Sequence, residues 1–414
     1  MKITTLKGCA MPGIGQRKIE GHRFSDTISF AVISRFIPCE KILSVLDHSK
    51  KGTKRSRLLP AHIMIYYIIA LGFYFESSSK EVLRYLLGSL RDLLPNGSLI
   101  PTACKSAISQ ARTRIGKEPV IALYNEIVQP IATDKTNGAY YNNKLLVVID
   151  GSKIDVADTE ENSTYFGKQK YGGFGGVKGE GAFPLMRFLS LIEVGTHVIF
   201  ETVYSKFSTG EFTLGKILLE KVKPNMLVLA DRLFFSYETW KIGVDKGAEL
   251  LWRIKKNTKL KITRTLPDGS SLAKIYPSEK ESKNDTNGII VRLIEYRIKE
   301  KNELYRLATT LLDHIEAPAE ELAALYSERW TVETAYDELK NHTREKKVFL
   351  KSKTPDLAIQ EFYGLLLAHY AIRGVMHEAA LQANLPPDRL SFIHSIRVVR
   401  RKLKTFSGFS PSRV

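Results

Sequence analysis

The sequence predicts an α/β protein with a helical N-terminal region, a mixed core of strands and helices, and an all-β block inside that core. From about residue 25 to 130, apolar residues recur at three- and four-residue spacing, which is typical of amphipathic helices. From 145 to 254, short continuous apolar runs alternate with helical patterns, as expected for buried strands joined by helices. From about 255 to 312, polar and apolar residues alternate between turn residues, which indicates β-structure.

The N-terminal region contains several predicted helices, and one of them is apolar enough to compare with a membrane span. Residues 58–75 are interrupted by proline, histidine and glycine, so we expect a buried helix there and no membrane span. Ser78 followed by Glu81 is a capping signal that begins the next helix. A short basic helix ends at Gly116. The region is therefore either a DNA-reading module or an ordinary helical bundle with a solvated basic face.

Two of the predicted core strands end in aspartate. The run LLVVID (145–150) ends at Asp150, and MLVLAD (226–231) ends at Asp231. Further strands are predicted at 187–207, on both sides of Gly195, and at 248–254, with helices at 210–222 and 235–247. Helical periodicity resumes at Pro318, continues through 361–382, and ends in a basic helix at about 389–404.

Composition and charge narrow the class of protein and of partner. The 414 residues are 43% hydrophobic and 10% aromatic, which is typical of a globular protein with two or three domains. A formal net charge of +18 favours a polyanionic partner, with nucleic acid ahead of an anionic membrane surface and of a merely basic protein. The 3 cysteines lack CxxC spacing, and the first residues lack the apolar segment of a signal peptide. We therefore expect a cytoplasmic protein with no disulfide framework.

Four polar residues share one face of a predicted helix near the C-terminus. At ~100° per residue they fall within an arc of about 60°. They are Tyr326, Arg329, Glu333 and Lys340. A separate apolar stripe, roughly 80° away around the helix, consists of Leu325, Val332, Tyr336 and Leu339. One carboxylate among cations, beside a stripe that faces the core, suits a site for metal and phosphate.

Asp150, Asp231 and Glu333 are the candidate metal ligands. Ligands of open α/β sheets bind beyond the carboxyl ends of the strands, where both aspartates are predicted to lie. Two carboxylates placed together repel unless a cation neutralises them. An all-oxygen set without His or Cys suits Mg²⁺ or Mn²⁺, and two such ions support phosphodiester cleavage. Either aspartate alone is better explained as a turn former, and the combination with the helical face is what favours a metal site.

The chain resembles the transposases of the insertion-sequence-4 family. The spacing Y-x₂-R-x₃-E-x₆-K, from Tyr326 to Lys340, is similar to that family's signature. IDGS around Asp150 and LADRLF around Asp231 resemble the two aspartate segments of its DDE triad. The segments FSDTISFAVISRFIP and LLPAHIMIYYIIALGFY resemble its helical N-terminal domain, so the resemblance covers nearly the whole chain.

The resemblance implies both the architecture and the reaction. It implies a helical, DNA-binding N-terminal domain (1–135) and a ribonuclease-H-like catalytic domain (136–414), with a β-rich insertion at about 255–312 and C-terminal helices at about 356–404. It also implies cut-and-paste transposition, in which Asp150, Asp231 and Glu333 hold two Mg²⁺ ions, replaceable by Mn²⁺. Activated water cleaves the transposon end, and the 3′-hydroxyl then attacks the target. The implied partners are the terminal inverted repeats and target DNA, bound by a dimer, with the protein associated with the nucleoid when it is on DNA.

Several residues are expected to contact that DNA. Tyr326, Arg329 and Lys340 are assigned to phosphates, as are Arg232 and Arg253. In relatives, the aromatic residue of a W-R-L-x-T stretch stacks on a flipped base. The matching stretch here begins at Tyr305, which either has that role or packs within the sheet. The glycine-rich residues 167–184 are expected to be a mobile loop that contacts DNA or simply connects two elements.

Two other functions remain open from the sequence. One is a ribonuclease-H-like nuclease or resolvase that uses the same metal chemistry without strand transfer. The other is a non-catalytic DNA-binding protein descended from a transposase.

Overall fold

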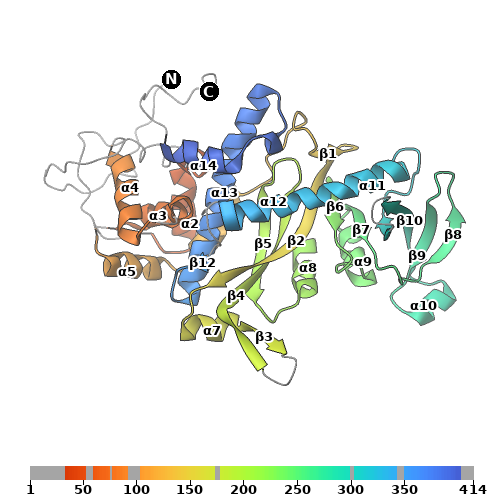
Figure 1. Ribbon diagram of the computed structural model, residues 1–414, viewed down its shortest axis with the longest axis horizontal. Coiled ribbons are helices and arrows are strands. Elements are labelled where there is room, and N and C mark those ends of the chain that lie inside the picture. Colours follow the sequence, from red (N-terminus) through yellow and green to blue (C-terminus); the bar gives the residue numbers. More distant parts are fainter. Residues whose placement is uncertain are drawn as a thin grey trace.

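The computed structural model describes residues 33–52, 59–74, 77–91, 103–172, 178–298, 303–342 and 349–401. A large twisted sheet occupies the centre, with the N-terminal helices at one end and a β-rich extension at the other (Figure 1). Residues 92–102, which join two of the predicted N-terminal helices, and the segment that precedes residue 33 lie outside the described residues.

Five strands of the sheet form the core around the candidate site, in the order β5-β4-β2-β6-β7. Strands β5, β4 and β2 are antiparallel to one another, and β6 and β7 continue the sheet parallel to β2. This order of three antiparallel strands and two parallel ones is that of a ribonuclease-H-like core, so the predicted fold is confirmed. Their bounds are β2 (Lys144–Val156), β4 (Lys178–Glu193), β5 (Ile199–Lys206), β6 (Met226–Ala230) and β7 (Glu249–Arg253).

The apolar run of β2 reflects its central place in the sheet. Its side chains from Leu145 to Ile149 are at most 3% exposed. Helix α12 packs on β2, while α8 and α9 pack beside β4 and β7. The smaller elements at the edge of this core are β1 (Tyr140–Tyr141), α7 (Glu160–Phe166), α8 (Glu211–Leu219), α9 (Tyr237–Asp245) and β12 (Phe349–Leu350).

The predicted all-β block continues the same sheet beyond β7. Strand β11 pairs with β7, where Leu307 lies opposite Arg253, and β10, β9 and β8 follow in antiparallel order. The strands are β8 (Lys261–Thr265), β9 (Ser271–Ile275), β10 (Ile289–Ile298) and β11 (Glu303–Thr309). One short helix, α10 (Glu279–Asn284), interrupts the block, because Ser278 caps the backbone N–H of Glu281.

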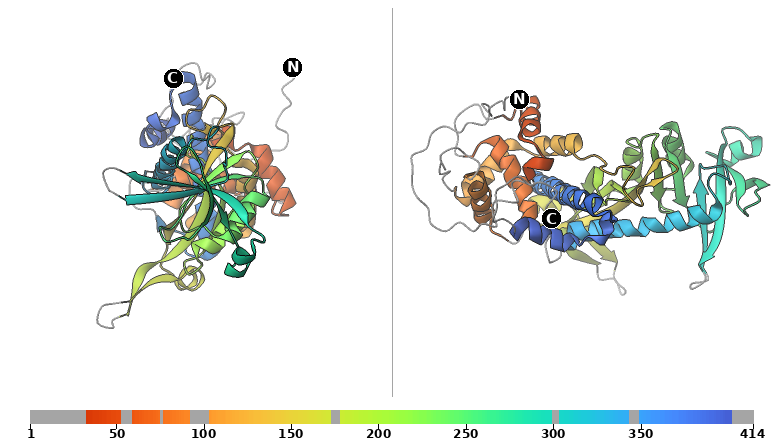
Figure 2. Two further views of the ribbon diagram at one scale, coloured as in Figure 1. Left: turned by 90° about the vertical axis from the view of Figure 1, so that its right-hand side faces the viewer. Right: turned by 90° about the horizontal axis from the view of Figure 1, so that it is seen from above.

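The helical end of the molecule is built around two buried helices, α3 and α13. Helix α13 packs against both α3 and α6, and the right-hand view of Figure 2 shows it lying between the N-terminal helices and the sheet. A Cβ on Gly364 would lie 2.5 Å from the carbonyl oxygen of Ile68, so only glycine permits this close approach. The helices are α2 (Cys39–His48), α3 (Ala61–Phe73), α4 (Ser79–Arg91), α5 (Lys105–Ile115), α6 (Glu118–Ile127), α13 (Pro355–Ala383), η5 (Pro387–Arg389) and α14 (Phe392–Arg401).

Within the apolar segment predicted at 58–75, Ala61–Phe73 form the buried helix α3, as predicted. Within the described residues, no helix is both long and apolar enough to cross a membrane. The capping signal is also confirmed, because Ser78 Oγ accepts the backbone N–H of Glu81 at 3.3 Å.

The described residues of the glycine-rich stretch at 167–184 do not form the loop that the sequence predicts. They form two paired strands, in which β3 (Lys168–Gly172) pairs antiparallel with the first half of β4. The ring of Phe183 packs edge-on against Phe349 of β12 at 5.0 Å. Ladder hydrogen bonds and this packing outweigh the weak strand preference of glycine.

The helix that carries the four polar residues is continuous but not uniform. It consists of α11 (Ala319–Ser327), the 3₁₀ turn η3 (Glu328–Thr331), α12 (Val332–Asp337) and the π turn η4 (Glu338–His342). It extends without a break from the β-rich extension toward α13 (Figures 1 and 2).

Candidate active site

Asp150 and Asp231 lie on neighbouring strands at adjoining levels of the sheet. In the parallel pair of β2 and β6, Ile149 lies opposite Ala230, and each aspartate is the next residue along the chain. Strand β2 does not end at Asp150, as the sequence suggests, but continues to Val156 because β4 pairs with it beyond that point. Both aspartates are therefore placed where β6 stops and β2 continues.

The helix with Glu333 lies across these two strands at the level of the two aspartates. The hydroxyl of Tyr326 donates to the backbone carbonyl of Ala230 at 3.3 Å, one residue before Asp231. The hydroxyl of Tyr336 donates to the backbone carbonyl of Asp150 at 2.6 Å. Contacts to β6 and to β2 thus bracket Glu333, which is exposed at the start of α12.

Burial and neighbouring charges perturb Asp150. Burial raises the pKa of its carboxyl to about 6, and the charges of Glu333 and Glu211 add to the increase. The guanidinium of Arg329 and the N–H of Gly151 oppose the increase in this pKa. Arg329 Nη1 lies 3.9 Å from Asp150 Oδ1. Asp150 and Glu333 are therefore close enough to repel, and a cation between them would relieve the repulsion.

The donor set fits an oxygen-preferring divalent ion in chemistry, but the side chains are not gathered around one point. Asp150, Asp231 and Glu333 provide carboxylates only, as Mg²⁺ and Mn²⁺ prefer. In the part of the chain that the structure describes, no group of three or more His, Cys, Asp or Glu side chains lies close enough together to hold a metal ion. Binding an ion at all three carboxylates requires them to move closer together.

Comparison with known proteins gives the family. Residues 141–370 match the family described as "Transposase DDE domain", which is more than half of the chain and includes all three carboxylates. Residues 27–125 match the family "Insertion element 4 transposase N-terminal". The chain belongs to the insertion-sequence-4 type of DDE transposases. It is thus an enzyme that cleaves DNA and transfers its strands, and the family depends on a divalent metal.

Two relatives come from Escherichia coli (strain K12). "Transposase InsG for insertion sequence element IS4" is 28% identical over 388 residues, or 92% of this chain and 84% of the relative. "Putative transposase InsZ" is 25% identical over 225 residues, or 54% of this chain and 71% of the relative. A solved piggyBac transposase synaptic complex with hairpin DNA has a TM-score of 0.45 and 10% identity, covering 90% of this chain and 79% of that one.

In the transposase structure, the predicted role of Tyr326 as a phosphate contact is wrong. The side chain is 2% exposed, and its hydroxyl is engaged by the carbonyl of Ala230. The 3₁₀ turn at Glu328–Thr331 separates it from Glu333 and rotates the two away from a common face. Tyr326 therefore fixes the helix beside Asp231 and is not available to DNA.

The stacking role predicted for Tyr305 is also contradicted. Its ring is 7% exposed and stacks on Tyr296, with centroids 5.5 Å apart. The guanidinium of Arg253 lies 4.2 Å from the centroid of the same ring. Because the ring of Tyr305 lies between the ring of Tyr296 and the guanidinium of Arg253, neither ring face is open for a base to stack on. Tyr305 therefore packs within the sheet.

The basic residues predicted to contact DNA are dispersed around the site. Arg253 is engaged twice, by the ring of Tyr305 and by Glu303 Oε1 at 3.1 Å. Arg232 is exposed next to Asp231. The ammonium of Lys340 donates to Ser152 Oγ at 2.7 Å, two residues beyond Asp150 on β2. Contacts of these residues with phosphate stay predictions.

Sequence reasoning missed three features of the site. Trp330 is 47% exposed, and the guanidinium of Arg329 lies 4.6 Å from its ring centroid. Glu211, at the start of α8, lies beside Gly151 and is paired with Arg187 at 2.8 Å. The third feature is the hydrogen bond of Tyr336 to the main chain of Asp150, because the sequence places Tyr336 only in the apolar stripe. Trp330 follows Arg329 directly and could have been found there, but no local pattern links Glu211 to Asp150.

Proposed function

We propose that this transposase moves its own insertion sequence by cut and paste, with Asp150, Asp231 and Glu333 as the metal ligands. The observation that carries the proposal is the helix laid across β2 and β6. Its hydrogen bonds to Ala230 and to the main chain of Asp150 hold Glu333 near both aspartates. The match to the DDE domain, which spans all three residues, supports the same assignment.

The metal supplies the charge that this chemistry needs. Two bound Mg²⁺ ions, or Mn²⁺ in their place, would acidify a water molecule and stabilise the leaving oxygen of the cleaved phosphodiester. The charge of Glu333 contributes to the raised pKa of Asp150. A divalent ion drawn between the two carboxylates would relieve this repulsion.

Arg329 and Lys340 would hold phosphates beside the scissile bond. Arg329 is 7% exposed, and its Nε has no hydrogen-bond partner among the residues that the structure describes. A phosphate oxygen arriving next to Asp150 would satisfy this donor. Lys340 lies over β2 through Ser152 and would act as a point charge on the backbone.

Tyr326 does not act as a nucleophile in this scheme. Burial raises the pKa of its phenol well above the ordinary value, so the hydroxyl stays protonated, and it donates to Ala230. Cleavage therefore proceeds by water, with no covalent bond between protein and DNA. The 3′-hydroxyl released from the end attacks the opposite strand or the target phosphate, and the displaced 3′-oxygen of that strand leaves.

Trp330 replaces Tyr305 as the candidate for stacking on an unpaired base. It is the half-exposed aromatic next to Arg329, whereas both faces of Tyr305 are covered. Base–aromatic stacking contributes about 1–3 kcal/mol per base. This assignment would place the base within reach of the same helix that carries Glu333.

The partners follow from the proposed reaction. We assign the N-terminal region, residues 1–135, to DNA binding and residues 136–414 to catalysis, and we expect two protomers to hold the two inverted-repeat ends together. The charge of +18 suits a protein that works on DNA in the bacterial cytoplasm.

The proposal is tested by cleavage of DNA that carries the inverted repeats flanking the gene. Glu333→Gln should abolish Mg²⁺-dependent cleavage while leaving end binding intact, because the amide keeps the shape and loses the charge. Glu328→Gln, on an exposed residue of the same helix, is the matched control and should cleave normally. Cleavage by the Glu333 variant would overturn the triad.

A second assay separates transposition from simple nuclease activity. A pre-cleaved end with a free 3′-hydroxyl should be joined to target DNA. Cleavage without joining would favour a nuclease or resolvase, and absence of both would favour a non-catalytic DNA-binding protein.

A further inference from the structure

Buried arginines from two other parts of the chain hold the two ends of the helix that carries Glu333. Arg292 of β10 holds the first end and Arg373 of α13 holds the second, and they are 0% and 1% exposed. Neither side chain is a predicted metal ligand or DNA contact. Each one bonds to the helix itself or to the segment that leads into it.

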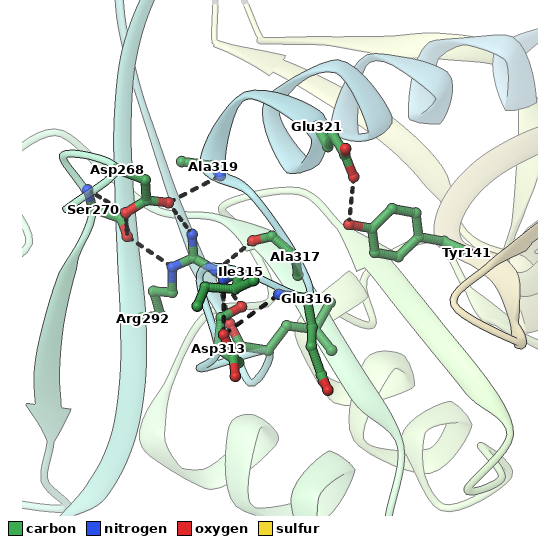
Figure 3. A network of polar contacts seen from close by, with 11 residues as sticks. Tyr141, Asp268, Ser270, Arg292, Asp313, Ile315, Glu316, Ala317, Ala319 and Glu321 are labelled. Carbon is green, nitrogen blue, oxygen red and sulfur yellow. Dashed lines mark hydrogen bonds and ion pairs between the residues drawn. The ribbon is translucent and has the colours of Figure 1, made fainter. Parts of the chain in front are cut away.

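At the first end, the helix takes its cap from the β-rich extension. Pro318, at the N-cap position, offers no side-chain acceptor, and the backbone N–H of Ala319 donates instead to Asp268 Oδ2 at 3.1 Å. A carboxylate at this position also complements the positive end of the helix dipole. Arg292 forms an ion pair with the same carboxylate (Figure 3).

Arg292 also binds the segment that enters the helix. It donates to the backbone carbonyls of Leu311, Asp313 and Ala317 at 3.3, 3.2 and 2.6 Å. Its Nε donates to Ser270 Oγ at 2.8 Å. One guanidinium therefore joins the turn between β8 and β9 to the approach of α11, as Figure 3 shows.

The first end of the helix is also hydrogen-bonded to the segment that leads into β2, the strand of Asp150. The hydroxyl of Tyr141 donates to Glu321 Oε2 at 3.0 Å (Figure 3), and Asn142 Nδ2 donates to the carbonyl of Glu316 at 2.8 Å. Tyr141 and Asn142 immediately precede β2. The start of the helix is thus fixed relative to both the β-rich extension and β2.

At the second end, Arg373 holds Glu338 at the start of the π turn. Arg373 Nε donates to Glu338 Oε2 at 2.9 Å, and its Nη2 donates to the other carboxylate oxygen. Nη2 also lies 2.6 Å from Nδ1 of His197, in the turn between β4 and β5. Burial acts to raise the pKa of Glu338, but the charge of Arg373 and the neighbouring His197 and His369 outweigh burial and lower this pKa, so the carboxyl stays ionised.

Stability alone does not explain two such ion pairs. Removing two charges from water costs about as much as their attraction returns, and well-packed apolar side chains of similar volume often serve as well. Apolar contacts, however, let a helix shift or rotate slightly, whereas the forked bonds of a guanidinium fix direction and distance. Catalytic groups need positions accurate to about 0.5 Å, so the ion pairs suit a helix that must present a carboxylate accurately.

We propose that Arg292 and Arg373 are positioning residues for Glu333, which set its place relative to Asp150 and thereby the affinity of the site for the divalent ion. The inference rests on the proposed function. Glu333 lies between the two anchors, five residues before Glu338 and fourteen after Ala319. A shift at either end would therefore change the position of its carboxylate.

The test neutralises both members of each pair, because a lone buried charge would unfold the protein. The variants are Arg292→Met with Asp268→Asn, and Arg373→Met with Glu338→Gln. Tyr66→Phe is the control, since it removes a buried hydrogen bond, to Ile37 at 3.0 Å, in the N-terminal helices. Mn²⁺ binding to the DNA-bound protein is measured by electron paramagnetic resonance, together with unfolding temperature, end binding and cleavage.

We expect each folded double variant to bind Mn²⁺ about 10-fold or more weakly, as when a group that orients a metal ligand is lost. End binding should stay unchanged, and the Tyr66 control should bind Mn²⁺ normally. A merely structural role would lower the unfolding temperature without changing the Mn²⁺ dissociation constant. Mn²⁺ binding and cleavage equal to those of the wild type would overturn the inference and leave the proposed function standing.

Two further results are also decisive. If a double variant does not fold, it is replaced by Arg292→Lys or Arg373→Lys. These single variants keep the positive charge but lose the paired hydrogen bonds of the guanidinium. Weaker Mn²⁺ binding would again support the inference, and wild-type Mn²⁺ binding and cleavage would overturn it. If the wild type cleaves no DNA with any divalent metal, the proposed function fails, and the Mn²⁺ comparison still decides the positioning role.

Discussion

The hydroxyl of Tyr336 donates a 2.6 Å hydrogen bond to the backbone carbonyl of Asp150, so the helix of the proposed third carboxylate is bonded to the residue that carries the first. Four residues further along the helix, Lys340 bonds to Ser152, two residues further along the strand. The two bonds join successive parts of the helix to successive parts of the strand, and together they fix the helix against β2.

Tyr336→Phe should reduce both stability and cleavage. The side chain is 4% exposed, so the carbonyl of Asp150 loses a partner in a buried place, at a cost of about 1–3 kcal/mol. Urea unfolding and the single-turnover cleavage rate measure the two effects. Tyr326→Phe, which removes the longer 3.3 Å bond to Ala230, is the companion variant and should cost less. Wild-type cleavage by Tyr336→Phe would show that this bond does not position the site.

Asp150→Asn should change how stability depends on pH. The folded protein raises the pKa of Asp150 from 3.8 to about 6, so the folded state binds its proton more tightly than the unfolded state does. The resulting stabilisation is present below about pH 4 and is lost as the pH rises to about 6, at ~1.4 kcal/mol per unit. In EDTA, the unfolding free energy of the variant minus that of the wild type should rise by up to about 3 kcal/mol between pH 4 and 7. A flat difference would contradict the raised pKa.

Lys340→Ala should weaken end binding in a salt-dependent way. Loss of one phosphate contact lowers the slope of log affinity against log salt by about one. Lys241→Ala is the control, since Lys241 is exposed on α9 and paired with Asp245 at 2.7 Å. Binding titrations from low to high salt measure both slopes. An unchanged slope for Lys340→Ala would remove this residue from the DNA contacts.

Trp330→Ala should weaken binding to an end with an unpaired base by about 1–3 kcal/mol, because a stacking surface is lost. Tyr305→Phe should bind the same DNA normally, since the ring of Tyr305 is covered by Tyr296 and Arg253. Fluorescence of 2-aminopurine at the unpaired position reports the stacking. Quenching that persists in Trp330→Ala would assign the stacking to another residue.

Periodicity predicted the elements around the site better than it predicted which side chains face DNA. The apolar run before Asp150 and the run before Asp231 became the parallel strands β2 and β6, because central strands are buried on both faces. A uniform 100° helix put Tyr326 on the face of Glu333. The turn at Glu328–Thr331 has about 120° per residue, which adds about 80° over four residues and explains why Tyr326 is buried and Glu333 exposed.

Contacts between distant segments lay beyond any local pattern. The faces of Tyr305 are covered by Tyr296 and Arg253, and neither adjoins it in the sequence. Likewise, Asp268 caps a helix that begins 51 residues later, and Glu338 meets Arg373 across 35 residues. Propensity and spacing report on neighbours along the chain, whereas these contacts depend on the finished sheet.

The bond between Tyr336 and Asp150 spans 186 residues, and this separation has a consequence for the order of events during synthesis. A chain leaving the ribosome can form β2, β4, β5 and β6 long before the helix with Glu333 exists. That helix gains its second anchor only when Arg373 has also emerged. Contacts so distant in sequence form late, so a chain that ends before residue 333 holds both aspartates but lacks the proposed third metal ligand. On the proposed assignment, DNA breakage waits for a nearly complete polypeptide.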